Sequence, residues 1–467
     1  MTQTQTQTQT QTRFDALNLP AAQLENLAAI GYERMTPIQQ LSLPVVLAGQ
    51  DLIAQAKTGS GKTAAFGIGL LTRLKPRLFA AQALVLCPTR ELATQVAREL
   101  RRLARYLDNI KIVTLCGGTP IGPQIGSLEH GAHIVVGTPG RIKDHLRKGT
   151  LTLDRVDCLV LDEADRMLDM GFADDIDTII DCTSAGRQTL LFSATYPKDI
   201  EQLSARYQRE PQRVTAPEQH SEAEIEQRAY LCDEPYKADT LIALLQRQAP
   251  DAAVIFCNTK ARCDEYAQAL KSAGFPVGVL HGDMEQRERD QRITLFRNRS
   301  LTLLVATDVA ARGLDIDAVD LVVNIDLPRE PDVYTHRIGR TGRAGRSGTA
   351  LSLVGPKETI KLERIDALQQ TPIQVIEQLP TPNPDYRPPR APMRTLAIAG
   401  GRKNKLRPGD IVGTLTAGGQ LTGEDIGDIH IDDFTAYVAV KRELSEIALD
   451  KLKSRTIKGK SFRVRKL

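Results

Sequence analysis

The chain has 467 residues, a length that suggests about three domains of ordinary size. Hydrophobic residues make up 41% of it and charged residues 25%, values that exclude a wholly disordered or fibrous protein. The formal net charge is only +4, which as a single number is too weak to indicate a nucleic-acid binder. No apolar run approaches the ~18 residues of a membrane span, so we expect no membrane partner.

The N-terminal segment, residues 1–12, consists of Thr-Gln repeats after Met1. It has neither the basic nor the apolar stretch of a secretory signal, and with nothing apolar to bury it is predicted to be a disordered tail. The seven cysteines form no Cys-x-x-Cys pair, which disfavours a zinc site or a disulfide framework. Isolated cysteines suit a reducing compartment, so we expect a cytoplasmic protein.

Two series of short apolar runs follow, and each run ends in a polar loop or a helix start. This pattern predicts buried parallel strands joined by crossover helices, and therefore an α/β fold. A polar stretch near residues 205–222 interrupts it and divides the chain into domains at 13–212 and 213–378. Examples of these runs are 51–56, 83–87, 133–137, 158–162 and 189–192 in the first domain, and 253–257, 277–280, 303–306, 321–324 and 350–354 in the second.

Residues 379–392 are rich in proline, which predicts a stiff, extended linker. The remaining residues, 393–467, are enough for a small domain. Their order of strand, helix, two strands, helix and strand predicts a ferredoxin-like fold, which the RNA-recognition motif uses. The expected elements are 395–399, 408–416, 426–431, 434–440, 443–453 and 461–465.

The segment from Ala56 to Thr63, Ala-Lys-Thr-Gly-Ser-Gly-Lys-Thr, lies between a predicted strand and a predicted helix. In that context it indicates a phosphate-binding loop, because glycines let backbone N–H groups approach phosphates and the helix N-terminus favours anions. We expect Lys62 to reach the β- and γ-phosphates and the Thr63 hydroxyl to bind Mg²⁺. Ala56 stands where the general pattern has glycine, and a plain Gly-rich turn is the alternative.

A later strand end carries the acidic run Asp162-Glu163-Ala164-Asp165. Asp162 is placed to hold Mg²⁺ through water, and Glu163 can orient and polarise an attacking water. Alone, such carboxylates are more often a solvated helix start. In one domain with a phosphate loop, they indicate a site that hydrolyses a nucleotide.

These motifs and their order resemble the DEAD-box RNA helicases over about residues 14–355. The resemblance implies two RecA-like parallel-sheet domains, the P-loop NTPase core of superfamily 2 helicases, which use ATP and Mg²⁺ to unwind or remodel RNA. It assigns adenine contacts to Gln39, whose amide can meet the base edge, and to Phe14, whose ring can stack on it. The other nucleotide contacts that it implies are Ala56, Lys57, Thr58, Gly59, Ser60, Gly61, Lys62, Thr63 and, at the ribose, Asp315.

The resemblance also implies which groups couple and complete the site. Ser193 and Thr195, which follow a predicted strand, would bond the acidic motif and report the nucleotide state, and His336 would help to couple the two domains. Two arginines of the second domain would act as fingers that reach the γ-phosphate only when the domains close. Without that resemblance, such a cluster is usually a solvated or RNA-facing patch. The expected catalytic set is Lys62, Glu163, Arg340 and Arg343.

Motifs similar to the family's RNA contacts also follow predicted strands, so they would emerge at one edge of each sheet. Hydroxyls, backbone amides and single arginines suit phosphates and 2′-hydroxyls, and such contacts do not read sequence. The expected residues are Thr89, Arg90, Gly118, Thr138 and Arg141 in the first domain, and Arg289 and Thr307 in the second.

The charge is divided unevenly along the chain. Residues 390–467 hold 16 Lys and Arg against 9 Asp and Glu, a net of +7, whereas residues 1–389 carry a net of −3. A basic domain of this kind has the electrostatic footprint of a nucleic-acid binder. Because its predicted sheet keeps only Tyr437 at a stacking position, we expect binding to rely on basic loops and the tail. The expected residues are Arg402, Lys403, Lys405, Arg455, Lys458, Lys460 and Arg463.

This last domain resembles that of the bacterial DbpA helicases, in Arg407-Pro-Gly-Asp-Ile-Val-Gly and Ile457-Lys-Gly-Lys. The resemblance implies binding to a hairpin of 23S rRNA and action on pre-50S particles during assembly of the large ribosomal subunit. Three alternatives stay open: an ATP-gated RNA clamp or assembly platform, a DNA helicase, and a small domain that docks on the core or on a protein. The sequence does not indicate the oligomeric state.

Overall fold

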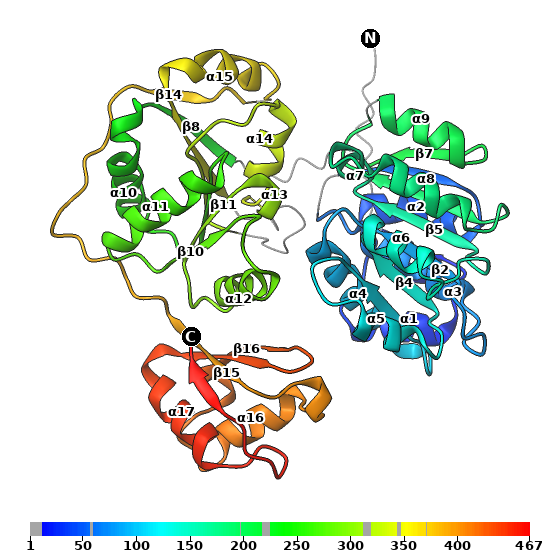
Figure 1. Cartoon of the computed structure of the whole chain (residues 1–467). Coiled ribbons are helices and arrows are strands. Elements are labelled where there is room, and N and C mark those ends of the chain that lie inside the picture. Colours follow the sequence, from blue (N-terminus) through cyan, green and yellow to red (C-terminus); the bar gives the residue numbers. More distant parts are fainter. Residues whose placement is uncertain are drawn as a thin grey trace. The chain divides into compact units, whose positions relative to one another are not determined.

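The computed structural model describes residues 12–56, 59–196, 198–216, 225–311, 319–342, 347–369 and 371–467. They form two compact units that divide near residue 220, each built on a seven-stranded sheet (Figure 1). We call these sheets, with their helices, the first and second lobes, and the second unit also contains a smaller C-terminal domain. Residues 1–11, Lys57, Thr58, Asp315 and Arg343 lie outside the described residues, so the expectations for them stay predictions.

The first lobe has the strand order β3-β4-β2-β5-β6-β1-β7 with every pair parallel, which confirms the predicted α/β fold. Strand β7 was not predicted because its sequence is polar and mostly exposed; it pairs with β1 and runs past the boundary expected at residue 212. The strands are β1 (Leu52–Gln55), β2 (Ala83–Leu86), β3 (Ile112–Leu115), β4 (Ile134–Gly137), β5 (Cys158–Asp162), β6 (Gln188–Ser193) and β7 (Gln212–Thr215).

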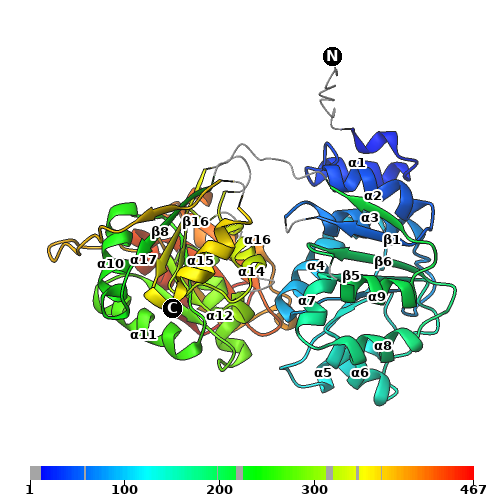
Figure 2. The ribbon, with the colours of Figure 1, turned by 90° about the horizontal axis from the view of Figure 1, so that it is seen from above.

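Two apolar cores cover the two faces of this sheet. Helices α1–α4 pack on one face and α6–α9 on the other, a layering that Figure 2 shows. The helices are α1 (Ala21–Ala29), α2 (Pro37–Leu47), α3 (Lys62–Arg73), α4 (Arg90–Leu103), α5 (Gly122–Leu128), α6 (Pro139–Arg147), α7 (Ala164–Asp169), α8 (Ala173–Asp181) and α9 (Lys198–Tyr207).

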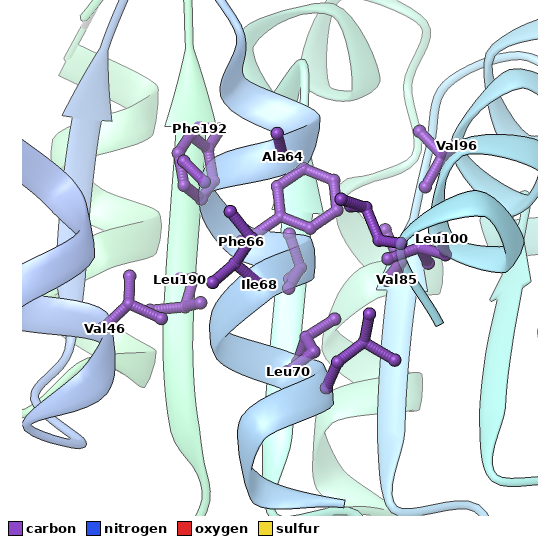
Figure 3. Packing of buried hydrophobic residues seen from close by; sticks show 14 of the residues in the cluster. Val46, Ala64, Phe66, Ile68, Leu70, Val85, Val96, Leu100, Leu190 and Phe192 are labelled. Carbon is purple, nitrogen blue, oxygen red and sulfur yellow. The ribbon is translucent and has the colours of Figure 1, made fainter. Parts of the chain in front are cut away.

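One aromatic contact ties the phosphate-loop helix to the sheet. The buried rings of Phe66 in α3 and Phe192 in β6 lie with their centroids 5.3 Å apart, within the core drawn in Figure 3. Complete burial of such a ring stabilises a fold by about 1.5–3 kcal/mol. The contact therefore fixes α3, and the loop before it, against the strand that ends at Ser193.

The second lobe has the order β10-β11-β9-β12-β13-β8-β14, again with parallel pairs. Helices α10 and α11 pack in one core of this lobe, and α14 and α15 pack in another. The strands are β8 (Ile225–Leu231), β9 (Ala253–Phe256), β10 (Val277–Leu280), β11 (Leu303–Ala306), β12 (Leu321–Asn324), β13 (Gly348–Val354) and β14 (Gln374–Ile376). The helices are α10 (Lys237–Gln248), α11 (Lys260–Ser272), α12 (Gln286–Arg297), α13 (Asp308–Ala311), α14 (Pro331–Ile338) and α15 (Thr359–Asp366).

The C-terminal domain is an antiparallel sheet, β16-β17-β15-β18, with α16 and α17 packed in its core. This arrangement confirms the predicted ferredoxin-like fold. Its elements are β15 (Met393–Ile398), α16 (Pro408–Thr416), β16 (Ile426–Ile431), β17 (Ala436–Lys441), α17 (Ser445–Ser454) and β18 (Val464–Lys466). Within the described ranges, no helix combines the length and apolar character that a membrane span needs.

The proline-rich linker is attached to the second lobe along part of its length. The ring of Tyr386 stacks on Phe275 with centroids 6.5 Å apart. The backbone N–H of Asn383 donates to Gln246 Oε1 at 2.7 Å, and Gln246 Nε2 donates back to the Asn383 carbonyl at 3.1 Å. The linker is therefore anchored before it reaches the C-terminal domain.

Candidate nucleotide site and nucleic-acid surfaces

Three motifs meet at one edge of the first sheet because the strands before them are neighbours. The phosphate loop follows β1, the acidic run follows β5 and Ser193-Ala194-Thr195 ends β6, and the sheet order places β5, β6 and β1 side by side. The carboxyl ends of parallel strands form the usual ligand edge of an α/β sheet. The sequence motifs thus converge on one site.

The phosphate loop has the backbone that its glycines permit. Gly59 and Gly61 take positive φ angles of 83° and 94°, which glycine adopts without strain. The buried Lys62 side chain spans the loop, and its Nζ donates to the Ala56 carbonyl at 2.9 Å. Ser60 and Thr63 are half-buried on either side. The loop and its lysine are therefore held in one compact turn.

Gln39 connects the predicted adenine motif to this loop. It is 1% exposed; its Oε1 accepts from the Thr36 backbone N–H at 2.9 Å, and its Nε2 donates to the Gly61 carbonyl at 3.1 Å. Phe14 lies differently from the expectation of an open stacking ring, because it is 3% exposed and meets Tyr32 edge to face at 6.1 Å. Phe14 here belongs to the core, and its contact with a base stays a prediction.

Asp162 is buried at the end of β5. Burial raises the pKa of its carboxyl to about 7; Lys62 opposes that rise, and Glu163 and Asp165 add to it. Its Oδ1 atom is buried with no hydrogen-bond partner among the described residues. A buried carboxylate oxygen that lacks a partner suits a hard cation such as Mg²⁺, which takes oxygen ligands and keeps several waters. The residues present therefore fit the predicted ion.

Glu163 occupies a strained turn between β5 and α7. Its φ of 53° lies in the left-handed region, which is uncommon for a residue other than glycine. Strain of this kind costs about 1–3 kcal/mol and persists only where surrounding contacts enforce it. One such contact is the buried ion pair from Arg166 to Glu163 Oε2 at 2.9 Å. The side chain is therefore held in one orientation.

The coupling motif contacts the acidic motif through Asp165. The Asp165 Oδ2 atom accepts from the backbone N–H groups of Ala194 at 3.2 Å and Thr195 at 2.9 Å, and from the Thr195 hydroxyl at 2.8 Å. Burial alone would raise the pKa of Asp165, but the hydrogen bonds from Thr195 outweigh it and lower the pKa. Ser193, which was also expected to bond the acidic motif, is buried with no partner for its hydroxyl among the described residues. A displacement of α7 would therefore change the hydrogen bonds of Ala194 and Thr195, which follow the end of β6.

Three of the five predicted RNA contacts of the first lobe line one groove of about 610 Å³. Gly118, Thr138 and Arg141 line it together with Lys143 and Arg147, and Asp144 and Asp175 also reach it. Gly118 has a φ of 70°, and a side chain there would collide with the guanidinium of Arg90. The Thr89 hydroxyl is used within the lobe, because it accepts from the Leu92 N–H at 3.2 Å and caps α4.

In the second lobe, Arg337 organises the helix that carries the predicted coupling and finger residues. It is 1% exposed and donates to both carboxylate oxygens of Asp308, at 2.6 and 2.7 Å. It also donates to Asn258 Oδ1 at 2.8 Å and to the Asp326 carbonyl at 2.6 Å. His336 is in α14, the buried Arg340 follows it, Thr307 precedes Asp308, and Arg289 is in α12.

The basic residues predicted in the C-terminal domain are exposed, but its sheet face is not. Tyr437, expected at a stacking position, is only 7% exposed, and Thr395 is fully buried. Thr395 Oγ1 lies 3.1 Å from Asn298 Nδ2 and 2.8 Å from Ser300 Oγ, both in the second lobe. The exposed basic residues are Arg402, Lys403, Lys405, Arg455, Lys458, Lys460 and Arg463.

Sequence reasoning missed three residues that shape the site. Asp165 was quoted within the acidic motif without a role, although it receives the coupling hydrogen bonds. Arg166 and Arg337 were given no role, and each proves to be a buried anchor. The i,i+3 spacing of Arg166 and Glu163 was a usable signal for their ion pair, whereas Arg337 pairs with Asp308, which is distant in the sequence.

Comparison with known proteins agrees with this geometry. Residues 36–203 match the DEAD/DEAH box helicase family, residues 236–345 the helicase conserved C-terminal domain and residues 395–466 the DbpA RNA binding domain. The chain is 52% identical over 455 residues to the ATP-dependent RNA helicase DbpA of Escherichia coli K12, covering 97% of this chain and 99% of that protein. It is 44% identical over 354 residues to the DEAD-box ATP-dependent RNA helicase CshA of Geobacillus kaustophilus, covering 76% of each.

A solved structure supports the same assignment. Dbp5 of S. cerevisiae, bound to RNA and ADP BeF3, aligns with a TM-score of 0.71 at 33% identity, over 78% of this chain and 95% of that one. The chain therefore belongs to the DEAD-box family of ATP-dependent RNA helicases, with a DbpA RNA-binding domain at its C-terminal end.

Proposed function

We propose that ATP is bound and hydrolysed at the edge of the first sheet, by the residues that the sequence motifs indicate. The observation that carries this proposal is the meeting of three motifs on neighbouring strands, with Asp165 bonded to Thr195. The loop amides and Lys62 bind the phosphates, and Gln39 reads the adenine edge. Mg²⁺, held through Asp162 and Thr63, would neutralise charge on the phosphates.

The remaining groups act on the attacking water and on the developing charge. Glu163, held by Arg166, orients the water and accepts its proton at a carboxylate oxygen. Arg340 and Arg343 of the second lobe stabilise the transferring phosphoryl group as the lobes close. Because hydrolysis then depends on closure, and closure on RNA lying across both lobes, ATP turnover is coupled to RNA.

The C-terminal domain, in our proposal, directs this activity to a hairpin of 23S rRNA in pre-50S particles in the cytoplasm. Three features support it: the match to the DbpA RNA binding domain, the net charge of +7 over residues 390–467, and the attachment of the domain to the second lobe through Thr395. Because the C-terminal domain is attached to the second lobe, RNA that it binds is held close to the lobe that carries Thr307 and Arg289.

The catalytic assignment is tested with Glu163→Gln, which removes the proton acceptor and keeps the shape of the side chain. ATP and RNA should still bind, while steady-state phosphate release falls by about 10²-fold or more, the range for loss of a general base. Glu129→Gln, at an exposed carboxylate of the same lobe, is the matched control and should leave turnover unchanged. Turnover near that of the unmodified protein in Glu163→Gln would refute the assignment.

The targeting assignment is tested by deleting residues 390–467, which keeps the linker anchors Asn383 and Tyr386. ATPase stimulation is compared between a 23S rRNA fragment and an unrelated RNA of equal length. We expect the deletion to remove the preference and to leave weak stimulation by either RNA. An undiminished preference would contradict targeting by this domain. Duplex release with ATP, but not with a nonhydrolysable analogue, would separate a helicase from an ATP-gated clamp.

A further inference from the structure

The face on which an RNA-recognition motif ordinarily stacks bases is covered in this chain. Thr395 is fully buried by Asn298 and Ser300, and the Met393 N–H donates to the Arg299 carbonyl at 3.3 Å. Burial and Asp432 raise the pKa of Tyr437, and charges on Arg287 and Asp290 of α12 also act on it. The second lobe therefore lies against the sheet near Tyr437, and RNA must be held by another surface.

A different surface gathers three basic segments at one end of the domain. The backbone N–H groups of Arg402 and Lys403 donate to the carbonyls of Asp432 and Asp433 at 2.8 and 2.9 Å. Any side chain at Gly401 would collide with the Asp432 carbonyl, so this close approach requires glycine. A third segment joins where Lys458 Nζ donates to the Lys405 carbonyl at 3.2 Å. We call Arg402, Lys403, Lys405, Phe434 and Lys458 the basic tip.

Phe434 is the aromatic member of the basic tip. At the β16–β17 turn its side chain is 71% exposed, the highest value among the exposed large hydrophobic residues that the structure describes. Three acids lie nearby and each is engaged: Asp433 with Arg402 at 3.1 Å, Asp432 with His430 at 2.9 Å, and Asp410 with Lys458 at 3.9 Å. An exposed ring among four cations lacks the apolar surround of a protein-binding patch, but it matches a nucleic acid, which offers π-faces and phosphates together.

We propose that the basic tip binds an unpaired RNA loop, with one base stacked on Phe434 and the flanking phosphates on Arg402, Lys403, Lys405 and Lys458. This inference rests on the proposed RNA targeting by the C-terminal domain and specifies where that contact is made. Single-stranded loops are preferred over duplex, because only an unstacked base can lie against the ring. The tip thus takes over the stacking role of the covered sheet.

The absence of tryptophan from the chain allows a direct test. Phe434→Trp preserves a stacking ring and introduces one fluorophore, and Phe79→Trp, at a 53% exposed phenylalanine of the first lobe, is the matched control. Each full-length variant is titrated with an RNA hairpin that has an unpaired loop and with a blunt duplex of the same stem. We expect the hairpin to quench the Phe434→Trp fluorescence, the duplex to leave it unchanged, and the control to respond to neither.

Affinity gives the second measurement. Phe434→Ala should weaken hairpin binding by about 5-fold to 100-fold, the range for one lost stacked base, while Phe434→Tyr and Phe79→Ala stay close to the unmodified protein. The basic tip would be overturned if the hairpin binds but leaves the fluorescence of Phe434→Trp unquenched, and if Phe434→Ala binds the hairpin as tightly as the unmodified protein does. The proposed targeting by the C-terminal domain would then remain intact. Hairpin binding that survives deletion of residues 390–467 unchanged would instead overturn the targeting. Binding of duplex and hairpin with equal quenching would also refute the loop-specific contact.

Discussion

Replacing Arg337 with methionine should detach the helix that carries His336 and precedes Arg340. Methionine fills much of the same space but removes the charge and every donor. The unmodified side chain makes two charged bonds to Asp308 and further bonds to Asn258 and the Asp326 carbonyl, and its guanidinium lies 5.1 Å from the centroid of the Phe256 ring. All of these contacts are lost together.

The size of the effect follows from the burial of the pair. Removing one partner of a buried ion pair costs about 3–5 kcal/mol, because the other charge stays desolvated. Asp308 is 20% exposed, so water can reach it in part, and we expect a loss near the lower end, about 3 kcal/mol. Arg337→Lys keeps the charge but cannot form the two-pronged contact, and about half of that loss is expected. In Arg337→Met with Asp308→Asn, the loss should be smaller than the sum of the two.

Hydrogen exchange at the amides of β12 reports the opening free energy of this lobe alone, which avoids treating a multidomain chain as two-state. Arg364→Met, at an exposed arginine on α15, is the control and should change that free energy by less than about 0.5 kcal/mol. RNA-stimulated ATP turnover should fall in Arg337→Met while ATP affinity, set in the first lobe, is kept. An opening free energy in Arg337→Met equal to that of the control would refute the anchoring role.

Two further results are expected. Thr195→Val removes the hydroxyl bond to Asp165 but keeps the backbone bonds, so RNA stimulation of kcat should fall several-fold at unchanged ATP KM; equal stimulation would contradict coupling through this bond. Lys441 and the groups of Thr422 lower the pKa of Asp425 to about 2. The stability that the ionised Asp425 contributes should therefore be complete above about pH 4 and lost as pH falls towards 2. Acid unfolding of Asp425→Asn should lack this pH-dependent loss of stability.

Much of the fold could be predicted because buried parallel strands have continuous apolar sequences. β5 has the predicted bounds, and β2 differs from its prediction by one residue. The three nucleotide motifs could be placed together for the same reason, since each follows such a strand. β7 could not be found, because it is a polar edge strand whose only support is its pairing with β1.

The parts of the site that escaped prediction depend on contacts between distant segments. Nothing in the sequence near Arg337 reveals that Asp308 is its partner, because 29 residues separate them. Tyr437 was expected to be open on periodicity alone, whereas the covering groups come from α12 and residues 298–300 of another domain. Phe434 was expected to begin a strand over residues 434–440, whereas β17 begins at Ala436 and Phe434 lies in the turn before it.

The division of charge acquires a physical meaning from these attachments. The net charge of +7 over residues 390–467 lies almost wholly in a domain that is tied to the second lobe by Thr395 and by the Tyr386 anchor of the linker. Electrostatic attraction to RNA acts over the Debye length, about 10 Å, and carries no sequence information. RNA that is attracted to the basic domain is therefore brought to the lobe that carries Arg340. Residues 1–389, with a net charge of −3, attract RNA only weakly by themselves. Because the sheet face is used for that attachment, specificity has to come from loops such as the basic tip, and the same docking that positions the domain removes its ordinary binding face.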